Sequence, residues 1–244
     1  MKRSHHPHMV RGNESRAEAF TRIELVSVCA ALGVLALLVL PALAANKPDS
    51  ERMVCFNNLR LVGRGVQAWS GDHNQQLPWW LPVADGGQRT STVRAGNAWF
   101  EYAFMSNELV TPKILACPSD VGVKRADNWS QFTGSATFRS LALSYSLSMH
   151  ASTDAPESWL SADRNFFAGV AASCPVNVNG LSSIDGTYRV PASYSPYRWT
   201  NAVHGTFGHF LTVDGSAEFT SNQRLREIMA VSSDTGAIHF LRAR

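Results

Sequence analysis

The chain has 244 residues, of which 45% are hydrophobic and 17% are charged, and its formal net charge at pH 7 is +3. This hydrophobic content excludes an intrinsically disordered protein, because disorder requires low hydrophobicity and high charge. The small, dispersed net charge lacks the concentrated basic face of a nucleic-acid-binding protein, so nucleic acid is not an expected partner. Four cysteines in a chain of this length are too few for a disulfide scaffold.

A long apolar run dominates the N-terminal part of the sequence. Residues 25–45 contain no charged side chain, and only Ser27, Gly33 and Pro41 lie outside the hydrophobic class. A bilayer core of about 30 Å requires about 20 helical residues, so the run predicts a membrane-spanning helix. A secretory signal peptide is the competing interpretation, with Ala42-Leu43-Ala44 as its cleavage site, although its apolar core is usually about 7–15 residues long.

The charges on either side of the run predict its orientation. The segment before it has more basic than acidic residues, namely Lys2, Arg3, Arg11 and Arg16 against Glu14 and Glu18. The charges just after it cancel, namely Lys47 and Arg52 against Asp49 and Glu51. By the positive-inside rule, the N-terminus stays in the cytoplasm and everything after Ala45 is exported.

The residues just before the run, Ala19-Phe20-Thr21-Arg22-Ile23-Glu24, contain a carboxylate that is costly beside a bilayer unless it is paired. This segment resembles the N-terminal processing and methylation motif of type IV pilins and type II secretion pseudopilins, in which Gly precedes Phe-Thr-Leu-Ile-Glu. Pro41 lies at the spacing of that family's helix-kinking proline. Ala19 and Arg22 depart from the motif, because the family has glycine and an apolar residue there.

The resemblance implies a leader peptide over 1–19 and a membrane anchor over 20–45. A prepilin peptidase would cut between Ala19 and Phe20 and methylate the new amino group of Phe20. Glu24 would then pair with that amino group on a neighbouring pseudopilin subunit, because pairing in the correct register offsets the cost of a buried charge. Met9 is an alternative start that would remove the cluster His5-His6-Pro7-His8, to which no metal role is assigned.

A second helix follows the anchor. Asn46-Lys47-Pro48-Asp49-Ser50 forms a polar break, and apolar residues then recur with a helical period: Met53, Phe56, Leu59, Leu61, Val62, Val66 and Trp69. These residues predict an exported continuation of the helix over 46–75. Residues 63–68 fit the dinucleotide fingerprint by letter, but they do not follow a strand, so no nucleotide cofactor is predicted.

Four further elements resemble, in order, those of a large bacterial set of pseudopilin-like proteins. They are Cys55-Phe56-Asn57-Asn58-Leu59-Arg60, Cys117-Pro118-Ser119-Asp120, Asp163-Arg164-Asn165, and His204 followed after nine residues by Asp214-Gly215. The resemblance implies a disulfide between Cys55 and Cys117, because both lie in these elements, and it leaves Cys174 over. Cysteine positions alone do not determine the pairing. Cys29 lies in the span and is expected to be a packing residue.

Residues 76–244 predict an exported α+β domain. Residues 119–140 and 151–165 are rich in small polar side chains and predict surface excursions, whereas residues 141–149 alternate as a strand does. Asp185-Gly186 and Asp214-Gly215 predict hairpin turns. Thr220-x-x-Gln223 predicts the capped start of a last short helix. The expected fold is α+β, with a long N-terminal transmembrane helix continuing into a domain packed on an antiparallel sheet, which is also the pilin-like architecture.

Catalytic motifs are lacking, so neither an enzyme nor a cofactor is predicted. His204 and Asp214 could form a base and its orienter, but their spacing favours a strand and its turn. Asp163, Asp185 and Asp214 carry oxygen ligands suited to calcium, yet no ligand-dense loop surrounds them, so no metal site is predicted.

The sequence thus predicts a single-pass protein of a bacterial inner membrane whose partners are the lipid bilayer, a prepilin peptidase and other pseudopilin subunits. It would assemble through its N-terminal helix in a type II secretion or type IV pilus-like system. One alternative is an anchored binding module that holds a polysaccharide on tryptophans in or beside loops: Trp79, Trp80, Trp99, Trp129, Trp159 and Trp199. Another alternative is an anchored hydrolase with an unrecognised site.

Overall fold

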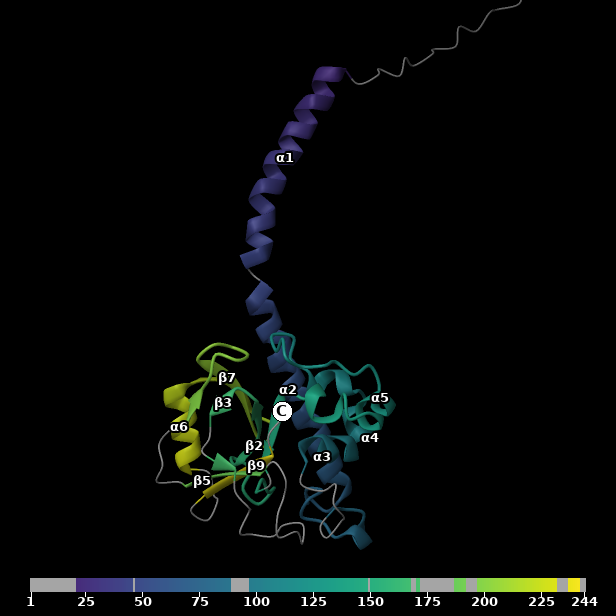
Figure 1. Ribbon diagram of the computed structural model, residues 1–244, viewed down its shortest axis with the longest axis vertical. Helices are drawn as coiled ribbons and strands as arrows, with labels where there is room; N and C mark the ends of the chain where they lie inside the picture. Colours follow the sequence, from purple (N-terminus) through teal and green to yellow (C-terminus); the bar gives the residue numbers. More distant parts are fainter. Residues whose placement is uncertain are drawn as a thin grey trace, which may run out of the picture. The chain divides into compact units, whose positions relative to one another are not determined.

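The computed structural model describes residues 21–45, 47–88, 97–148, 150–167, 170–171, 187–191, 197–231 and 237–241. Helices and antiparallel strands make up these residues, so the predicted α+β class is confirmed. The chain divides into two compact units, Met1–Lys47 and Pro48–Arg244, and each is described by itself (Figure 1). The expected processing site at Ala19 and Phe20 lies outside the described residues, as does Cys174.

The first unit contains the helix α1 (Arg22–Ala45), which includes Pro41. Its described side chains are exposed, with Ile23 at 79% and Leu37 at 75%, and apolar residues occupy all of its faces. A helix without a polar stripe is not the surface helix of a water-soluble domain. Among the described residues, α1 alone contains a segment, Arg22–Leu40, that is long and apolar enough to cross a membrane.

A reciprocal pair of hydrogen bonds begins α1. Thr21 Oγ1 accepts from the backbone N–H of Glu24 at 3.3 Å, and Glu24 Oε2 accepts from the backbone N–H of Thr21 at 2.8 Å. The Thr21 hydroxyl also donates to Glu24 Oε2 at 2.8 Å. This is a capping box, which satisfies backbone donors that the first helical turn leaves unpaired. Glu24 therefore has a local structural role in addition to the assembly role expected for it.

The helix α2 (Lys47–Asp72) follows α1, and almost all of it belongs to the second unit. The predicted polar break is wrong in its extent, because residues 47–50 already form the first turn of α2. Residues on one face of α2 are buried at alternating spacings of four and three: Cys55, Leu59, Val62, Val66 and Trp69. The predicted amphipathic helix is confirmed, but the predicted apolar positions Met53 and Leu61 are exposed, at 57% and 42%.

Two glycines let α2 approach its neighbours closely. A Cβ added to Gly65 would lie 2.5 Å from Cδ2 of Leu109, in helix α4 (Ser106–Leu109), and one added to Gly63 would lie 3.0 Å from Cδ1 of Leu211, in strand β7 (Phe207–Thr212). The two glycines that match the dinucleotide fingerprint therefore allow α2 to pack closely against β7 and α4.

The main sheet has seven antiparallel strands in the order β4-β5-β9-β1-β2-β7-β8. The strands not yet bounded are β1 (Tyr145–Ser148), β2 (Trp159–Asp163), β4 (Val170–Ala171), β5 (Thr187–Pro191), β8 (Ala217–Ser221) and β9 (Ala237–Leu241). A separate pair, β3 (Phe166–Phe167) and β6 (Arg198–Trp199), forms a small second sheet. The turn between β7 and β8 contains Asp214-Gly215, which confirms that predicted hairpin, whereas Asp185-Gly186 lies outside the described residues.

Helices cover both faces of the main sheet. Helix α2 packs on one face, with α3 (Ala98–Phe104), α4 and α5 (Trp129–Gly134) beyond it, and α6 (Asn222–Val231) packs on the other (Figure 1). Neighbouring residues of β7 point to opposite sides, so Leu211 joins the core under α2 and Phe210 joins the core under α6. Short 3-10 helices lie in the connections: η1 (Val83–Asp85), η2 (Pro112–Leu115) and η3 (Arg139–Ala142).

The prediction of a surface excursion over 151–165 is wrong at its C-terminal end. Residues 159–163 form β2, which lies within the sheet and has all five of its residues buried. Ser161 Oγ donates to the carbonyl of Ser146 at 2.7 Å, and Asp163 Oδ2 accepts from the backbone N–H of His209 at 2.6 Å. Buried polar groups are tolerated when they are hydrogen-bonded, and these partners lie far away in the sequence, where composition does not reveal them.

Two element boundaries also differ from the prediction. In the segment 141–149, the strand β1 comprises only Tyr145–Ser148, because the chain before it forms η3. Helix α6 begins at Asn222 and is capped by Ser221, whose Oγ accepts from the backbone N–H of Arg224 at 3.3 Å. The hydroxyl of Thr220 instead donates to the carbonyl of Gly208 at 3.2 Å.

Candidate functional site

A disulfide joins Cys55 of α2 to Cys117, which lies 62 residues further along the chain, and both residues are fully buried. This is the pair that the family resemblance implies. Backbone groups on both sides of the bridge are anchored to the start of β1. The Tyr145 hydroxyl donates to the carbonyl of Cys55 at 3.2 Å, and the backbone N–H of Cys117 donates to Ser144 Oγ at 2.9 Å.

Asp120, the last residue of the Cys-Pro-Ser-Asp element, forms a buried ion pair with Arg164. Its carboxylate accepts from Arg164 Nε and from a terminal guanidinium nitrogen, each at 2.5 Å. The Ser144 hydroxyl and the backbone N–H of Gly122 also donate to it, at 2.9 and 3.1 Å. Hydrogen bonding to Asp120 raises the pKa of Arg164 above its usual value. The ion pair thus fastens the loop after Cys117 to the residue that follows β2.

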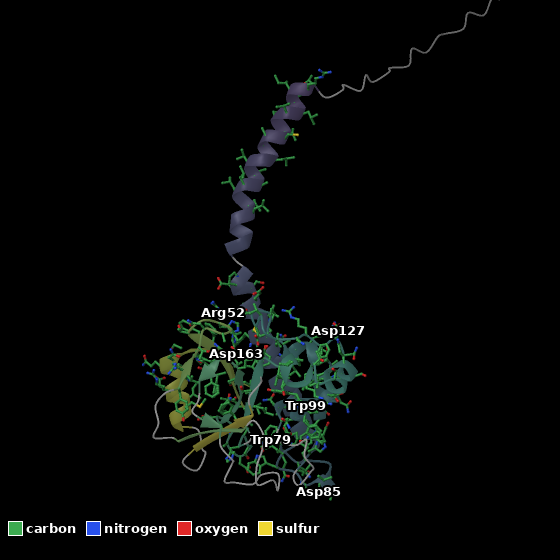
Figure 2. All side chains as sticks on the ribbon, in the orientation of Figure 1. Arg52, Trp79, Asp85, Trp99, Asp127 and Asp163 are labelled. Atoms are coloured by element: carbon green, nitrogen blue, oxygen red, sulfur yellow. A yellow bond between two sulfur atoms is a disulfide. The ribbon has the colours of Figure 1, made fainter. Side chains whose placement is uncertain are left out.

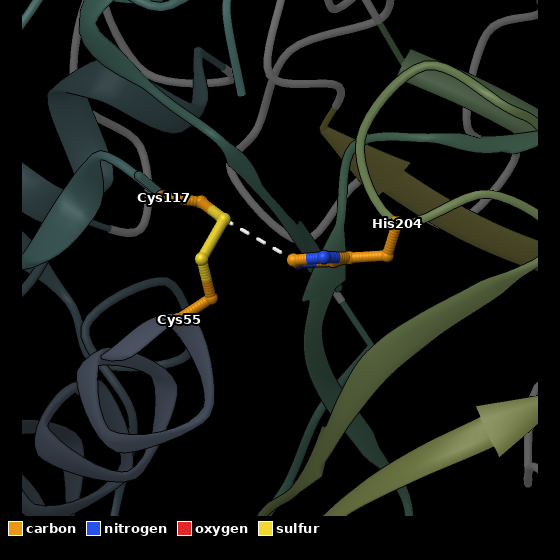
Figure 3. A group of neighbouring side chains, drawn as sticks. All are labelled: Cys55, Cys117 and His204. Carbon is orange, nitrogen blue, oxygen red and sulfur yellow. Dashed lines mark hydrogen bonds between the residues drawn. A yellow bond between two sulfur atoms is a disulfide. The ribbon is translucent and has the colours of Figure 1, made fainter. Parts of the chain in front are cut away.

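Asp163 lies beside two histidines. Its Oδ2 atom is 2.9 Å from His209 Nδ1 and 3.5 Å from His204 Nε2, and the two imidazole rings meet edge to face with their centroids 4.7 Å apart. His204 Nε2 also lies 3.3 Å from Cys117 Sγ, and Figure 3 shows the imidazole directed at the disulfide. Burial lowers the pKa of His204, an effect that the negative charge of Asp163 partly offsets.

Asn165 holds the loop that carries His204. Its side-chain amide donates to the carbonyl of Thr200 at 2.8 Å and to that of Phe207 at 3.0 Å. The Thr200 hydroxyl donates back to the carbonyl of Asn165 at 2.7 Å. Consecutive residues of the Asp-Arg-Asn element therefore bind His209, Asp120 and the His204 loop in turn.

Several residues that the sequence analysis names separately thus meet at one place, which we call the disulfide–histidine site: Cys55, Cys117, Asp120, Asp163, Arg164, Asn165 and His204. Asp214 does not join them. It lies in the turn after β7, where its carboxylate accepts from the backbone N–H of Ser216 at 2.9 Å, and Gly215 has the positive φ of 85° that this turn requires. Glu24 and Pro41 lie in the other unit.

Two members of the site were missed. His209 sits in β7 on the same side of the strand as Leu211, so alternation indicates an inward position but does not identify its partner. Ser144 precedes β1 and belongs to a run of alternating small residues that gives no sign of its bonds to Asp120 and Cys117.

Asp163 and Cys117 both contact the same nitrogen of His204, and this arrangement differs from that of a hydrolytic relay. In a hydrolytic relay, the carboxylate binds the imidazole nitrogen that faces away from the nucleophile. Here Asp163 Oδ2 and Cys117 Sγ both contact Nε2 of His204, and the sulfur is held in a disulfide. The described residues of the site therefore do not form a Cys-His-Asp relay.

The tryptophans mostly fill the core. Trp79, Trp99, Trp159 and Trp199 are buried, and Figure 2 labels the first two within the folded unit. Trp159 and Trp199 lie in strands β2 and β6, not in loops.

Trp80 and Trp129 are only partly buried, and Trp80 lines a cavity of about 510 Å³ together with polar residues at the end of α2. The lining also includes Asp72, His73, Asn74, Gln76, Leu81, Pro82 and Asp85. The Trp80 ring is fixed, because its Nε1 donates to the carbonyl of Ala151 at 2.6 Å. Asn74 and Gln75 have positive φ values of 55° and 60°, which non-glycine residues seldom adopt.

Comparison with known proteins finds no family model, no curated protein and no solved structure that matches this chain.

Proposed function

We propose that the protein is a pseudopilin-like structural subunit that is anchored in a membrane by α1 and assembles with other subunits through that helix. The observation that carries the proposal is the apolar surface of α1, which is exposed on all sides in the described residues. Such a surface is stable only in lipid or against other apolar helices. The proposal also draws on Glu24, the first charged residue before the apolar run, and on the resemblance of its surroundings to the prepilin processing motif.

The first test is the N-terminal mass of the protein purified from its own membranes. The proposal expects a chain that begins with N-methylated Phe20. A chain that begins near Ala45 would indicate a secretory signal peptide and would overturn the proposal.

The second test measures assembly directly. Cys29 is an exposed, free cysteine on α1, so mild oxidation in the membrane should cross-link neighbouring subunits. The experiment uses a Cys174→Ser variant, in which Cys29 is the free cysteine, because Cys55 and Cys117 are joined in a disulfide. Replacing Cys29 by serine in that variant is the control and should abolish the cross-link. Glu24→Gln preserves a capping box, because glutamine serves in it as glutamate does, but it removes the charge. The proposal expects cross-linking to fall strongly in Glu24→Gln while the amount of membrane-inserted protein stays unchanged. Cross-linking at the original level would contradict charge pairing.

The cavity beside Trp80 favours a second candidate function, in which the exported unit holds a polysaccharide. A fixed, partly exposed indole beside carboxylates and amides offers a stacking face next to hydrogen-bonding groups for hydroxyls. Retention on immobilised polysaccharide should be lost in Trp80→Ala and kept in Trp129→Ala, which changes a partly exposed tryptophan elsewhere. Equal retention by both variants would remove this candidate.

A further inference from the structure

The disulfide–histidine site contains three metal-binding side chains whose donor atoms face one another. They come from different parts of the fold: Asp163 ends β2, His209 lies within β7, and His204 lies in the loop before β7. Asp163 Oδ2 is 2.9 Å from His209 Nδ1 and 3.5 Å from His204 Nε2. Four ligands around Zn²⁺ at tetrahedral angles and bond lengths of 2.0–2.1 Å lie about 3.3 Å apart. These two separations lie on either side of this value, and all three donor atoms lie within 4.8 Å of one another.

The burial of the three side chains and an unpaired carboxylate oxygen support a cation. The exposed fractions of the Asp163, His209 and His204 side chains are 0%, 1% and 2%. Asp163 Oδ1 is buried and has no hydrogen-bond partner in the described structure, although Oδ2 accepts from the His209 backbone. A buried carboxylate oxygen without a partner is costly.

The surroundings have the features of an outer shell. Ligands in metal sites are held by further hydrogen bonds that fix their orientation. The backbone N–H of His209 holds Asp163 Oδ2 at 2.6 Å, and Asn165 holds the loop of His204 at Thr200 and Phe207. The loop lies at the surface, because its residues Asn201, Ala202, Gly205 and Thr206 are exposed.

We propose that Asp163, His204 and His209 bind one divalent transition-metal ion such as Zn²⁺ and that the ion fastens the His204 loop to strands β2 and β7. One carboxylate and two imidazoles are a common zinc ligand set, with water in the fourth position. The disulfide remains intact and forms a wall of the site. The proposal is independent of membrane assembly, because all three ligands belong to the second unit.

The test is a titration of the full-length protein in detergent with Zn²⁺, followed by calorimetry, and with Co²⁺, followed by visible absorption. His5, His6 and His8 are replaced by alanine in every sample, because this histidine cluster would bind the same ions. We expect one ion per chain and the intense visible absorption of tetrahedral Co²⁺ without a sulfur charge-transfer band. Absence of binding to the folded protein would overturn the proposal.

Ligand variants locate the ion. His204→Ala removes a ligand from a loop, so the sheet should remain folded, and its affinity should fall by at least about a hundredfold, since the loss of an outer-shell partner alone costs 10–100-fold. Asp163→Asn keeps an oxygen acceptor for the His209 backbone and should also lose affinity. His73→Ala is the matched control, because His73 stacks on Trp69 with ring centroids 3.8 Å apart, outside the site, and its affinity should be unchanged. Unchanged affinity in a folded His204→Ala variant would overturn the assignment.

The neighbouring sulfurs allow a competing site that the same titration distinguishes. Cys55, Cys117 and His204 could also gather an ion once a phosphine reductant has cleaved the disulfide to two thiols. The proposal expects Co²⁺ to bind the oxidised protein, and Cys55→Ser/Cys117→Ser to retain the affinity. Binding that requires reduction and brings a sulfur charge-transfer band would place the ion on the thiolates and overturn the assignment to Asp163, His204 and His209.

Discussion

Asp120 is a single side chain that links the loop after Cys117 to the end of β2. Its side chain is fully buried, and its carboxylate bonds to Arg164, Ser144 and the backbone of Gly122. Removal of one partner of a buried pair leaves the other charge without compensation, and this costs more than the pair itself contributes.

We therefore expect Asp120→Ala to lower the free energy of unfolding by about 3 kcal/mol, the lower end of the range for breaking a buried ion pair, because the Arg164 side chain is 21% exposed. Urea unfolding of the full chain in detergent measures the change. Asp127→Ala is the control, because Asp127 pairs with Lys113 where both side chains are mostly exposed, at 74% and 61%. Such surface pairs contribute about 0–1 kcal/mol. Equal losses in the two variants would contradict the role of Asp120.

At the scale of the elements, β6 and β7 approach each other at a glycine. A Cβ added to Gly208 of β7 would lie 2.4 Å from a ring carbon of Trp199, whose Nε1 donates to Thr220 Oγ1 at 3.2 Å. The indole is buried and hydrogen-bonded, so it has little freedom to move away from an added methyl group.

Gly208→Ala should lower the free energy of unfolding by about 1–3 kcal/mol, the usual cost of overpacking a tight core. Gly134→Ala in α5 provides the contrast, because nothing lies within 4 Å of its added Cβ. That variant should be stabilised by about 0.4–1 kcal/mol through the unfolded state. Thermal unfolding of both variants tests the pair, and destabilisation of the same size in each would refute the packing argument.

At the scale of the whole molecule, the disulfide–histidine site couples stability to pH. Burial lowers the pKa of His204 in the folded protein below the ordinary value of 6.5 that the unfolded chain has. Between these two values the unfolded state binds more protons, so stability rises with pH. The contribution is fully present above pH 6.5 and is lost as the pH falls below it.

In metal-free protein prepared with a chelator, acidification below about pH 6.5 should destabilise the fold by up to about 1.4 kcal/mol per pH unit for this single group. His204→Gln should flatten the profile in that range. The measurement is urea unfolding at a series of pH values, and an unchanged slope in His204→Gln would assign the effect to other groups.

The sequence was most informative where one element carries its own pattern. The spacing of Leu59, Val62 and Val66 predicts α2, and Asp214-Gly215 predicts the β7–β8 turn, because both depend on local periodicity or local backbone conformation. It was least informative for β2. Ser161 and Asp163 read as polar surface, yet each is buried against a partner supplied by another strand.

The candidate site was predicted in part for the same reason. The short elements around Cys55, Cys117, Asp163 and His204 were identified by resemblance, but residue spacing does not reveal that they converge. His209 was missed because a lone histidine in an alternating strand has no local pattern. His209 belongs to the site because its imidazole contacts Asp163, which lies 46 residues away in the sequence.

The disulfide has a mechanical consequence. A pulling force that enters the second unit from α1 first reaches α2, and Cys55 lies in the N-terminal half of α2. The bridge closes a loop of 62 residues that cannot extend under load. This loop would otherwise add roughly 210 Å to the contour length of the unfolded chain. Force spectroscopy between the two chain ends should therefore record a contour gain that is shorter by this length than in the reduced protein. Tension applied through α1 would bypass the region between the cysteines and reach the strands directly.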